Sequence, residues 1–286
     1  MIRSMLFVPG DSPRKFASAM RGSADALVLD LEDAVALSRK AEARVATAEM
    51  LRSVGNGEKR LFVRVNALDT GLTLEDLAAV MPLSPYAIML PKCSGGADVA
   101  RLALYLDAFE AASQQRVGRT RILAIATETA ASLFGLGSYA AVSPRLWGLM
   151  WGGEDLAASL GASANRAAGR WLEPYEHART LCLAGAAAAG VTAVDTVSTD
   201  IHDLERLSQE ARDARRDGFG AKAVIHPSHV DPVNAAFSPT EDELAWARRV
   251  VAAFAAAPEA GGVQIDGKMI DKPHLRAAQR LLGVVP

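Results

Sequence analysis

Eight short apolar segments recur along the chain, and longer segments with apolar residues at helical spacing separate most of them. Most of these segments are nearly continuous apolar runs, which is typical of strands buried on both faces of a parallel sheet. The eight segments cover residues 4–8, 26–31, 61–65, 86–90, 122–126, 146–151, 192–197 and 222–225. The alternation of strands and helices predicts an α/β fold, a (β/α)8 TIM barrel. A doubly wound open sheet is the alternative that periodicity leaves open.

The pattern changes after the eighth segment. The spacing predicts a long helix over 240–257, which begins with the capping pair Thr240 and Glu243. A turn with two glycines and a short final helix follow. A barrel typically needs about 250 residues. We therefore expect a barrel domain over residues 1–239 and a C-terminal helical extension over residues 240–286, which acts as a packing appendage or a lid.

Charge and composition exclude several classes of protein. The chain has 31 basic and 33 acidic residues, and a nucleic-acid-binding protein usually has a clear basic excess. Its longest apolar stretch, residues 181–191, is shorter than the roughly 20 residues that a membrane span needs. Its two cysteines form no disulfide framework, and its first residues are too short an apolar run for a signal peptide. We expect a cytoplasmic protein that binds neither nucleic acid nor a membrane.

Polar and charged residues follow most of the predicted strands, at the end of a barrel where active sites are built. They include Arg14 and Lys15 after the first strand, Asp30, Glu32 and Asp33 at the second, Arg64 and Asn66 at the third, Lys92 after the fourth, Glu128 after the fifth and Asp155 after the sixth. Any one of these residues alone is more simply a cap or a surface charge. Carboxylates that converge on one mouth repel one another unless protons or a cation neutralise them. A hard divalent cation such as Mg2+ is the simplest solution.

Two cations in the same mouth indicate an anionic substrate. Arginine binds a carboxylate through two parallel hydrogen bonds in many proteins, so Arg64 could hold an anionic group, and Lys92 adds a second positive charge. Other motifs are weaker. His226 and His229 have no evident third ligand for zinc, and Cys93 has no evident histidine partner that would make it a nucleophile.

The order of short motifs along the chain carries a family resemblance. These motifs are L-F-V-P-G-D-S-P-R-K-F, L-D-L-E-D-A-V, R-V-N-A-L-D-T, L-P-K, T-E-T-A, W-G-G-E-D-L-A, D-T-V-S-T-D and I-H-P-S-H-V. They span nearly the whole chain and resemble the citrate lyase β-subunit-like family of the HpcH/HpaI aldolase/citrate lyase superfamily. The tail D-G-K-M-I-D-K-P-H is similar to the C-terminal segment of malyl-CoA and citramalyl-CoA lyases.

The resemblance implies a metal site at the barrel mouth. Glu128 in T-E-T-A and Asp155 in G-E-D-L would bind Mg2+, with Mn2+ as the other candidate. Glu32 and Asp33 would hold water molecules on that metal. Glu128 would also contact the substrate.

The resemblance further implies how substrate binds. Arg64 would bind the carboxylate of a small 2-keto acid, assisted by the neighbouring Asn66 and Lys92. Arg14 and Lys15 would meet the phosphates of coenzyme A. Asp271 would be the acid/base, delivered by the tail of a neighbouring subunit in a homotrimer or hexamer.

The activity that the resemblance implies is Mg2+-dependent carbon–carbon cleavage, or the reverse Claisen condensation. A 3-hydroxyacyl-CoA such as citramalyl-CoA or malyl-CoA would yield acetyl-CoA plus pyruvate or glyoxylate. Thr127, Ala221 and His229 depart from the usual family motifs and leave the acyl group and keto acid open. Three alternatives also stay open: a citrate lyase β subunit acting on a citryl-carrier, a metal-dependent aldolase for free 2-keto acids, and a non-catalytic barrel.

Overall fold

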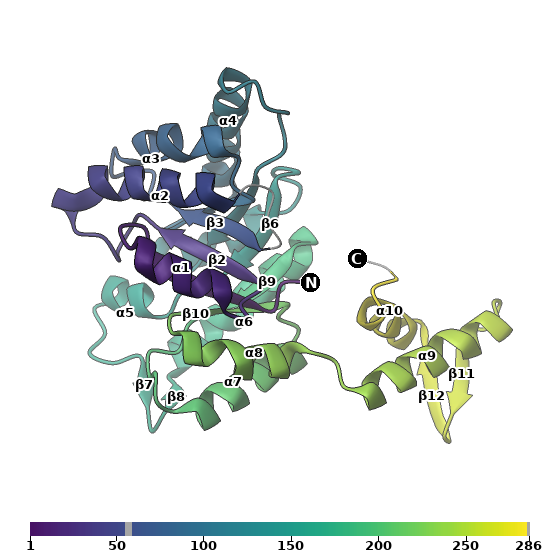
Figure 1. Cartoon of the computed structure of the whole chain (residues 1–286). Helices are drawn as coiled ribbons and strands as arrows, with labels where there is room; N and C mark the ends of the chain where they lie inside the picture. Colours follow the sequence, from purple (N-terminus) through teal and green to yellow (C-terminus); the bar gives the residue numbers. More distant parts are fainter. Residues whose placement is uncertain (55–58, 285–286) are drawn as a thin grey trace. The chain divides into compact units, whose positions relative to one another are not determined.

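The computed structural model describes residues 1–54 and 59–284. It divides into two compact units, Met1–Phe237 and Ser238–Pro286. In the first unit eight parallel strands close into a barrel with the order β1-β10-β9-β6-β5-β4-β3-β2 (Figure 1). The predicted (β/α)8 barrel is therefore confirmed, and the open sheet is excluded.

Each of the eight predicted strands is present, and its ends lie within two residues of the predicted ones. The strands are β1 (Ser4–Pro9), β2 (Ala26–Asp30), β3 (Arg60–Arg64), β4 (Ala87–Leu90), β5 (Arg121–Ile125), β6 (Leu146–Met150), β9 (Thr192–Asp195) and β10 (Ala221–Val224). All eight pairings are parallel, so every strand ends at the same mouth of the barrel.

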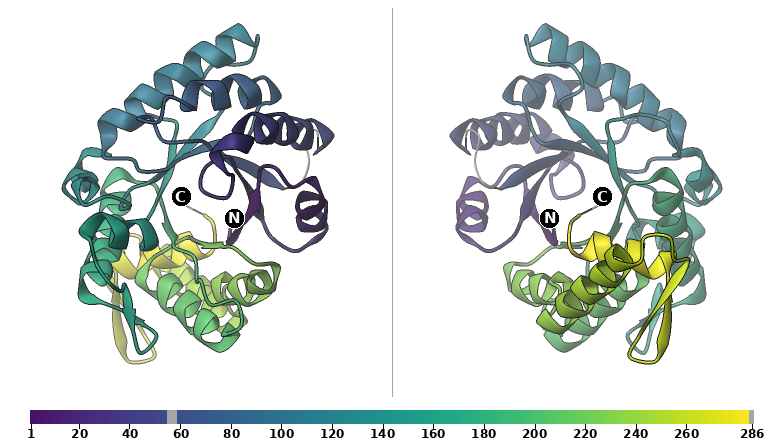
Figure 2. Two further views of the ribbon diagram at one scale, coloured as in Figure 1. Left: turned by 90° about the vertical axis from the view of Figure 1, so that its left-hand side faces the viewer. Right: turned by 90° about the vertical axis from the view of Figure 1, so that its right-hand side faces the viewer.

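Helices surround the strands (Figure 2). They are α1 (Pro13–Arg21), α2 (Lys40–Val54), α3 (Thr73–Val80), α4 (Gly96–Ala112), α5 (Glu154–Leu160), α6 (Glu173–Ala189), α7 (Leu204–Asp217) and α8 (Val230–Phe237). Short 3-10 turns lie at η1 (Leu37–Arg39), η2 (Met81–Leu83), η3 (Ala131–Ser138) and η4 (Pro227–His229). The sequence pattern did not resolve α3, α5 and α8, because each is at most eight residues long and spans barely two turns.

The strands bury both of their faces, which explains their continuous apolar sequence. In β2, Ala26 and Val28 belong to a cluster inside the barrel, whereas Leu27 and Leu29 belong to the layer between strands and helices. Phe62 occupies the barrel interior and contacts Trp147 edge-on, with ring centroids 5.3 Å apart. The interior is thus a packed core, and the active site of such a barrel is built at the carboxyl ends of its strands.

Two hairpins were not predicted from the sequence. In the first unit β7 (Arg166–Ala167) pairs with β8 (Arg170–Trp171), and in the second unit β11 (Gly262–Ile265) pairs with β12 (Lys268–Asp271). The second hairpin turns at Asp266 and Gly267, both with positive φ (51° and 76°). An Asp-Gly pair is the preferred sequence for such a turn, so the signal was present in the chain.

The second unit has a small core of its own. The helix α9 (Glu241–Ala256), the β11–β12 hairpin and the helix α10 (Lys272–Leu281) enclose Val250, Phe254 and Ile270. The capping pair forms as predicted: the Glu243 amide donates to Thr240 Oγ1 at 3.2 Å, and the Thr240 amide donates to Glu243 Oε2 at 2.7 Å. Throughout the described ranges, every helix is too short or too polar to cross a membrane.

Candidate active site

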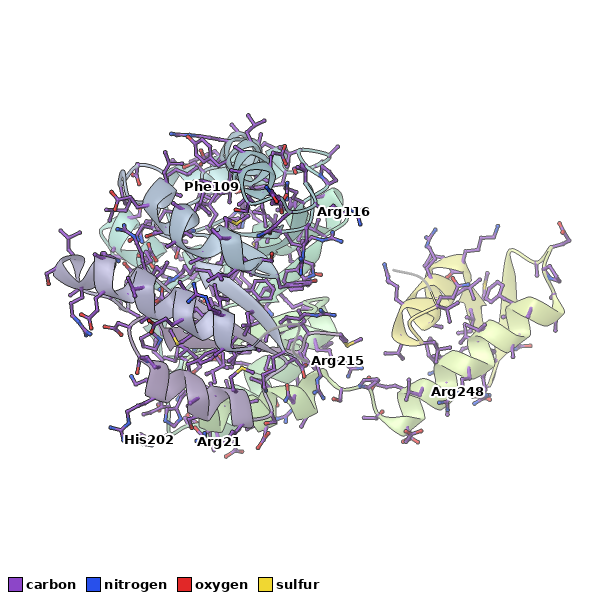
Figure 3. All side chains as sticks on the ribbon, turned by 45° about the horizontal axis from the view of Figure 1, so that its top comes forward. Arg21, Phe109, Arg116, His202, Arg215 and Arg248 are labelled. Carbon is purple, nitrogen blue, oxygen red and sulfur yellow. The ribbon has the colours of Figure 1, made fainter. Side chains whose placement is uncertain are left out.

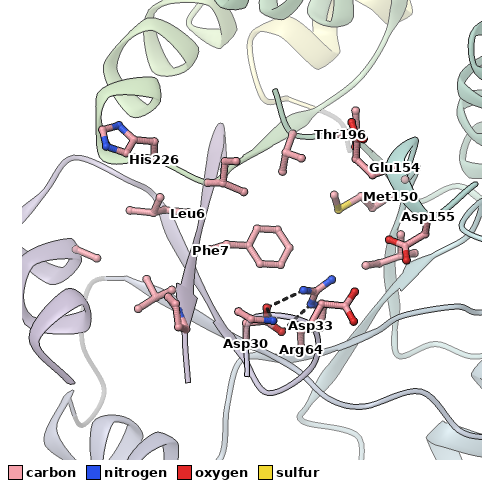
Figure 4. A pocket seen from close by; sticks show the side chains of 18 of the residues that line it. Leu6, Phe7, Asp30, Asp33, Arg64, Met150, Glu154, Asp155, Thr196 and His226 are labelled. Atoms are coloured by element: carbon pink, nitrogen blue, oxygen red, sulfur yellow. Dashed lines mark hydrogen bonds and ion pairs between the residues drawn. The ribbon is translucent and has the colours of Figure 1, made fainter. Parts of the chain in front are cut away.

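A cavity of about 640 Å³ lies at the carboxyl ends of the barrel strands. Figure 4 shows the side chains that surround it. Its polar lining includes Lys15, Asp30, Asp33, Arg64, Glu128, Glu154, Asp155, Thr196 and His226, and its apolar lining includes Leu6, Phe7, Ile125, Met150, Val197 and Ile225. The side chains come from the ends of strands that are far apart in sequence, and the closed barrel brings them together.

Asp30 fixes the position of Arg64 in this cavity. The two residues are in register at the ends of β2 and β3, and they form a bidentate pair with Nε–Oδ1 at 2.8 Å and Nη2–Oδ2 at 2.6 Å (Figure 4). Arg64 Nη1 lies 2.9 Å from Glu32 Oε2, and the guanidinium carbon lies 5.0 Å from the centre of the Phe7 ring. Burial opposes the charge, but Asp30 and the other carboxylates raise the pKa of Arg64. Since a guanidinium has five N–H donors, some remain for a substrate carboxylate.

Lys92 contacts carboxylates that follow three different strands. Its backbone φ of 51° is left-handed, a conformation that costs about 1 kcal/mol for a residue other than glycine. In this conformation its amide N–H donates to Glu128 Oε2 at 2.5 Å. Its ammonium group pairs with Glu32 and lies 3.6 Å from Asp155 Oδ1. Main chain and side chain of one residue therefore contact different members of the acidic cluster.

Glu128 is the most perturbed carboxyl group of the mouth. The residue is 3% exposed, and burial raises its pKa to about 8, with the nearby negative charges of Asp155 and Glu32 adding to the effect. Burial also raises the pKa of Glu32. A glycine at position 152 makes room for this side chain, because a Cβ there would lie 2.8 Å from Glu128 Cγ. The carboxyl groups around Arg64 and Lys92 thus outnumber these two cations, and Glu128 keeps a proton at neutral pH.

The carboxylate oxygens at the mouth fit a hard divalent cation whose remaining ligands are water or substrate oxygens. Glu128 and Asp155 offer carboxylate oxygens on the same cavity. Within residues 1–54 and 59–284, no three histidine, cysteine or acidic side chains are arranged to hold a metal ion by themselves. Mg2+ is commonly bound through one or two carboxylates, with water and substrate oxygens completing its octahedron. The elevated pKa of Glu128 is the local sign that a positive charge would be accommodated here.

Of the other site residues expected from the sequence, some line the cavity and some do not. Lys15 and Asp33 line the cavity, whereas Arg14 is exposed and is not among its lining residues. Asn66 is buried, and its amide group donates to Asp76 Oδ2 at 2.6 Å and to the Leu31 carbonyl at 3.1 Å. These contacts fix the chain after β3. Asn66 is not among the residues that line the cavity.

Asp271 belongs to the second unit, where it precedes α10 at the end of β12. Its Oδ1 lies 2.5 Å from His274 Nδ1, and this contact lowers the pKa of the Asp271 carboxyl group. The side chain is 44% exposed. Asp271 is therefore an ionised, accessible carboxylate on the surface of its own unit.

Several lining residues escaped the sequence analysis. The apolar runs predict only strand core for Phe7, Ile125 and Met150, which form an apolar wall of the cavity. Alternation along each strand determines which residue faces inward. Asp30 was noted at a strand end, but its pairing with Arg64 depends on the β2–β3 register. Cys93 is buried, which raises its pKa to about 11, so its thiol stays protonated at neutral pH.

Comparison with known proteins places this geometry in a family. Residues 3–227 match the family described as HpcH/HpaI aldolase/citrate lyase, and residues 175–284 match the family described as C-C bond lyase of the TIM-barrel fold. A citrate lyase subunit beta-like protein of Mycobacterium tuberculosis is 38% identical over 278 residues, covering 97% of this chain and 93% of the relative. A (3S)-malyl-CoA thioesterase of Cereibacter sphaeroides is 35% identical over 284 residues, covering 98% and 93%.

A solved structure agrees with the sequence comparison. The protein CitE of M. tuberculosis, crystallised with magnesium, acetoacetate and coenzyme A, superposes with a TM-score of 0.79 at 36% identity. The match covers 98% of this chain and 97% of that protein. The barrel, the acidic mouth with its arginine, and these matches along nearly the full length of the chain lead to one conclusion: the chain belongs to the HpcH/HpaI aldolase/citrate lyase family.

Proposed function

We propose that this protein is a Mg2+-dependent carbon–carbon lyase for a 3-hydroxyacyl-CoA, which it cleaves to acetyl-CoA and a small 2-keto acid. The observation that carries the proposal is the shared cavity of Arg64, Glu128 and Asp155. It combines a fixed cation for a carboxylate with a buried glutamate and a partly exposed aspartate that could bind a metal together. The M. tuberculosis protein that was crystallised with magnesium, acetoacetate and coenzyme A supports this choice of metal and substrate class.

Each group at the mouth has a distinct task in the proposed reaction. Glu128 and Asp155 would hold Mg2+, which supplies Lewis-acid polarisation of the oxygen that becomes the keto group. Arg64 would bind the substrate carboxylate with the N–H groups that Asp30 and Glu32 leave free. The apolar side chains of Phe7 and Met150 would exclude water from the reacting carbon atoms.

The proposed reaction also needs a group that transfers protons. In the cleavage direction a base removes the hydroxyl proton, the carbon–carbon bond breaks, and its electron pair passes to the acetyl-CoA enolate. We assign to Asp271 of a neighbouring subunit the removal of a proton from acetyl-CoA in the condensation direction, for which its ionised carboxylate is suited. In the cleavage direction the protonated form of the same group would return that proton to the enolate and become the carboxylate again. Replacing Asp271 by Asn should abolish turnover while leaving Mg2+ and keto-acid binding intact. Retained turnover in that variant would remove Asp271 from the mechanism.

The reaction is tested most directly in the condensation direction. Purified protein, Mg2+ and acetyl-CoA are mixed with glyoxylate or pyruvate in turn, with EDTA in the control, and the CoA species are separated by mass. We expect an EDTA-sensitive hydroxyacyl-CoA product with one of the two keto acids. Absence of any new CoA ester with both acids would contradict the proposal and favour citryl-carrier chemistry or a free keto-acid aldolase.

Hydrolysis of a CoA thioester is a second candidate, because a 35% identical relative is named (3S)-malyl-CoA thioesterase. The two activities differ in their products. A lyase interconverts thioesters and releases no free thiol, whereas a thioesterase releases coenzyme A with a free thiol group. Thiol release from a purified hydroxyacyl-CoA, measured without any keto acid, separates the two.

A further inference from the structure

The opposite end of the barrel carries a second cavity, of about 320 Å³, where β3, β4 and β5 begin. Its lining consists of Leu51, Lys59, Arg60, Leu61, Leu83, Ser84, Pro85, Tyr86, Arg119 and Arg121. Among the described residues, each charged side chain in that lining is a cation. This concentration is unexpected in a chain whose formal net charge is −2.

Neighbouring strands set the spacing of these cations. Arg60 is the first residue of β3, Arg121 is the first residue of β5, and Tyr86 immediately precedes β4, which lies between them. The Tyr86 amide donates to the Leu61 carbonyl at 2.9 Å, and the Arg121 amide donates to the Tyr86 carbonyl at 3.0 Å. Because the strands are parallel and in register, Arg60 and Arg121 flank Tyr86 on the rigid edge of the barrel.

Two of the cations are held in place by neutral groups. The Arg60 guanidinium lies over the Tyr86 ring, 5.1 Å from its centre. Lys59 Nζ donates to the carbonyl oxygens of Gly22 at 2.6 Å and Ala24 at 2.7 Å. The Tyr86 ring therefore positions the Arg60 charge without neutralising it.

Two described carboxylates near this end of the barrel have other partners. Glu110 accepts hydrogen bonds from the Thr120 amide, between Arg119 and Arg121, but its carboxylate pairs with Arg145. Asp25 pairs with Arg3 in the same way. Within the described residues, Arg119 and Arg121 form no ion pair with any of these groups.

We propose that this cavity binds the phosphate group of a small molecule, such as a phosphate monoester or a diphosphate. Arginine forks match phosphate oxygens in geometry and charge, and Ser84 adds a hydroxyl group to the lining. The volume lies at the lower end of the roughly 300–1,000 Å³ typical of ligand sites, which favours a compact ligand. The site is separate from the catalytic mouth because it is built from the opposite ends of the strands, and it does not depend on the proposed function.

Calorimetric titration of the full-length protein with inorganic pyrophosphate tests the proposal, with EDTA present so that no metal–pyrophosphate complex forms. The test variant is the pair Arg119→Gln and Arg121→Gln, which keeps the polar stems and removes both charges. The matched control is Arg116→Gln, since Arg116 is exposed three residues earlier and does not line the cavity (Figure 3).

We expect saturable binding to the wild type and to Arg116→Gln with dissociation constants that agree within about twofold. The double variant should bind at least roughly tenfold more weakly, as expected when two charge-assisted hydrogen bonds are lost. Acetate, which carries a single charge, should bind far more weakly than pyrophosphate. All replaced side chains are exposed, so the melting temperatures should match, and Arg119→Gln alone serves as the test if the double variant does not fold.

Three results would overturn the proposal. The first is a titration of the wild type that does not saturate. The second is equal affinity in the wild type and the double variant, which would place the anion elsewhere, for instance at Lys15 and Arg64 in the mouth. The third is equal binding of acetate and pyrophosphate, which would indicate a general anion effect without a phosphate site.

Discussion

Two buried glutamates near opposite ends of the same barrel have opposite electrostatic surroundings. Glu110 accepts hydrogen bonds from the Gly118 and Thr120 amides and from Arg145, and although burial opposes its charge, these bonds lower its pKa to about 2. Glu128 accepts one described hydrogen bond, from the Lys92 amide, and burial raises its pKa to about 8. Neither side chain is exposed. The burial penalty dominates at Glu128, which lies in deeper surroundings, whereas hydrogen bonds outweigh it at Glu110.

The contrast distinguishes a structural ion cluster from a functional one. Arg145 and its two acidic partners satisfy one another, and the cluster needs nothing from solution. At the mouth, the carboxyl groups outnumber the two cations, Arg64 and Lys92. A cation bound from solution would therefore be stabilised there. Strongly shifted pKa values next to a cavity are typical of functional sites, and the difference can be tested by changing one glutamate at a time.

The largest expected effect is the loss of turnover in Glu128→Gln. Glutamine keeps the shape of the side chain but removes the charge that would hold Mg2+, so we expect turnover to fall by more than about 100-fold, the loss seen even for outer-shell partners of metals. The measurement is the EDTA-sensitive condensation rate together with Mg2+ affinity. Wild-type metal affinity in this variant would show that the mouth is not a metal site.

Glu110→Gln should instead affect stability. It leaves the Arg145 guanidinium, whose side chain is 4% exposed, without its buried counter-charge, and breaking a buried pair typically costs about 3 kcal/mol of unfolding free energy. Urea denaturation measures this loss, and the turnover of the folded fraction should be unchanged. The double replacement of Glu110 and Arg145 by Met is the control, because it removes both charges and should recover part of the loss. A larger effect on turnover than on stability would contradict the structural assignment.

The two glutamates should also give the metal-free protein opposite responses to pH. Between about pH 4.5 and 8, folded Glu128 keeps a proton that the unfolded chain loses, so the free energy of unfolding should decrease as pH rises through this window. Glu110 contributes stability that is present above its unfolded pKa and is lost as pH falls toward about 2. Thermal melts in EDTA measure both slopes. Glu128→Gln should flatten only the upper one, and an unchanged upper slope would contradict the raised pKa.

The smallest effect is expected at the rim of the mouth. Lys15 lines the cavity and is exposed, so Lys15→Gln should raise KM for the CoA ester by roughly two- to fivefold, the range of an exposed ionic contact, and leave kcat unchanged. Arg14→Gln is the matched control, since Arg14 does not line the cavity. Equal changes of KM in both variants would contradict the expectation that Lys15 contacts the CoA ester and Arg14 does not.

The sequence predicted the barrel strands well because parallel strands bury both faces and therefore appear as unbroken apolar runs. It also placed Arg64, Glu128 and Asp155 at strand ends, and the closed barrel brings these three to one cavity. It could not predict contacts that depend on strand register, such as the bidentate pair of Asp30 and Arg64. The short helices and the β7–β8 hairpin hold too few residues for a periodic pattern, whereas the β11–β12 hairpin is indicated only by its Asp266-Gly267 turn.

The left-handed backbone at Lys92 restricts which mutations this position can accept. Glycine adopts that conformation without strain and would keep the hydrogen bond from the main-chain N–H to Glu128. It would, however, remove the ammonium group that pairs with Glu32. Arginine would keep a positive charge but would bring a larger, planar head group among the same carboxylates. No single substitution preserves both contacts, so sequence drift at position 92 should be slow even though the residue is neither a proposed metal ligand nor part of the core.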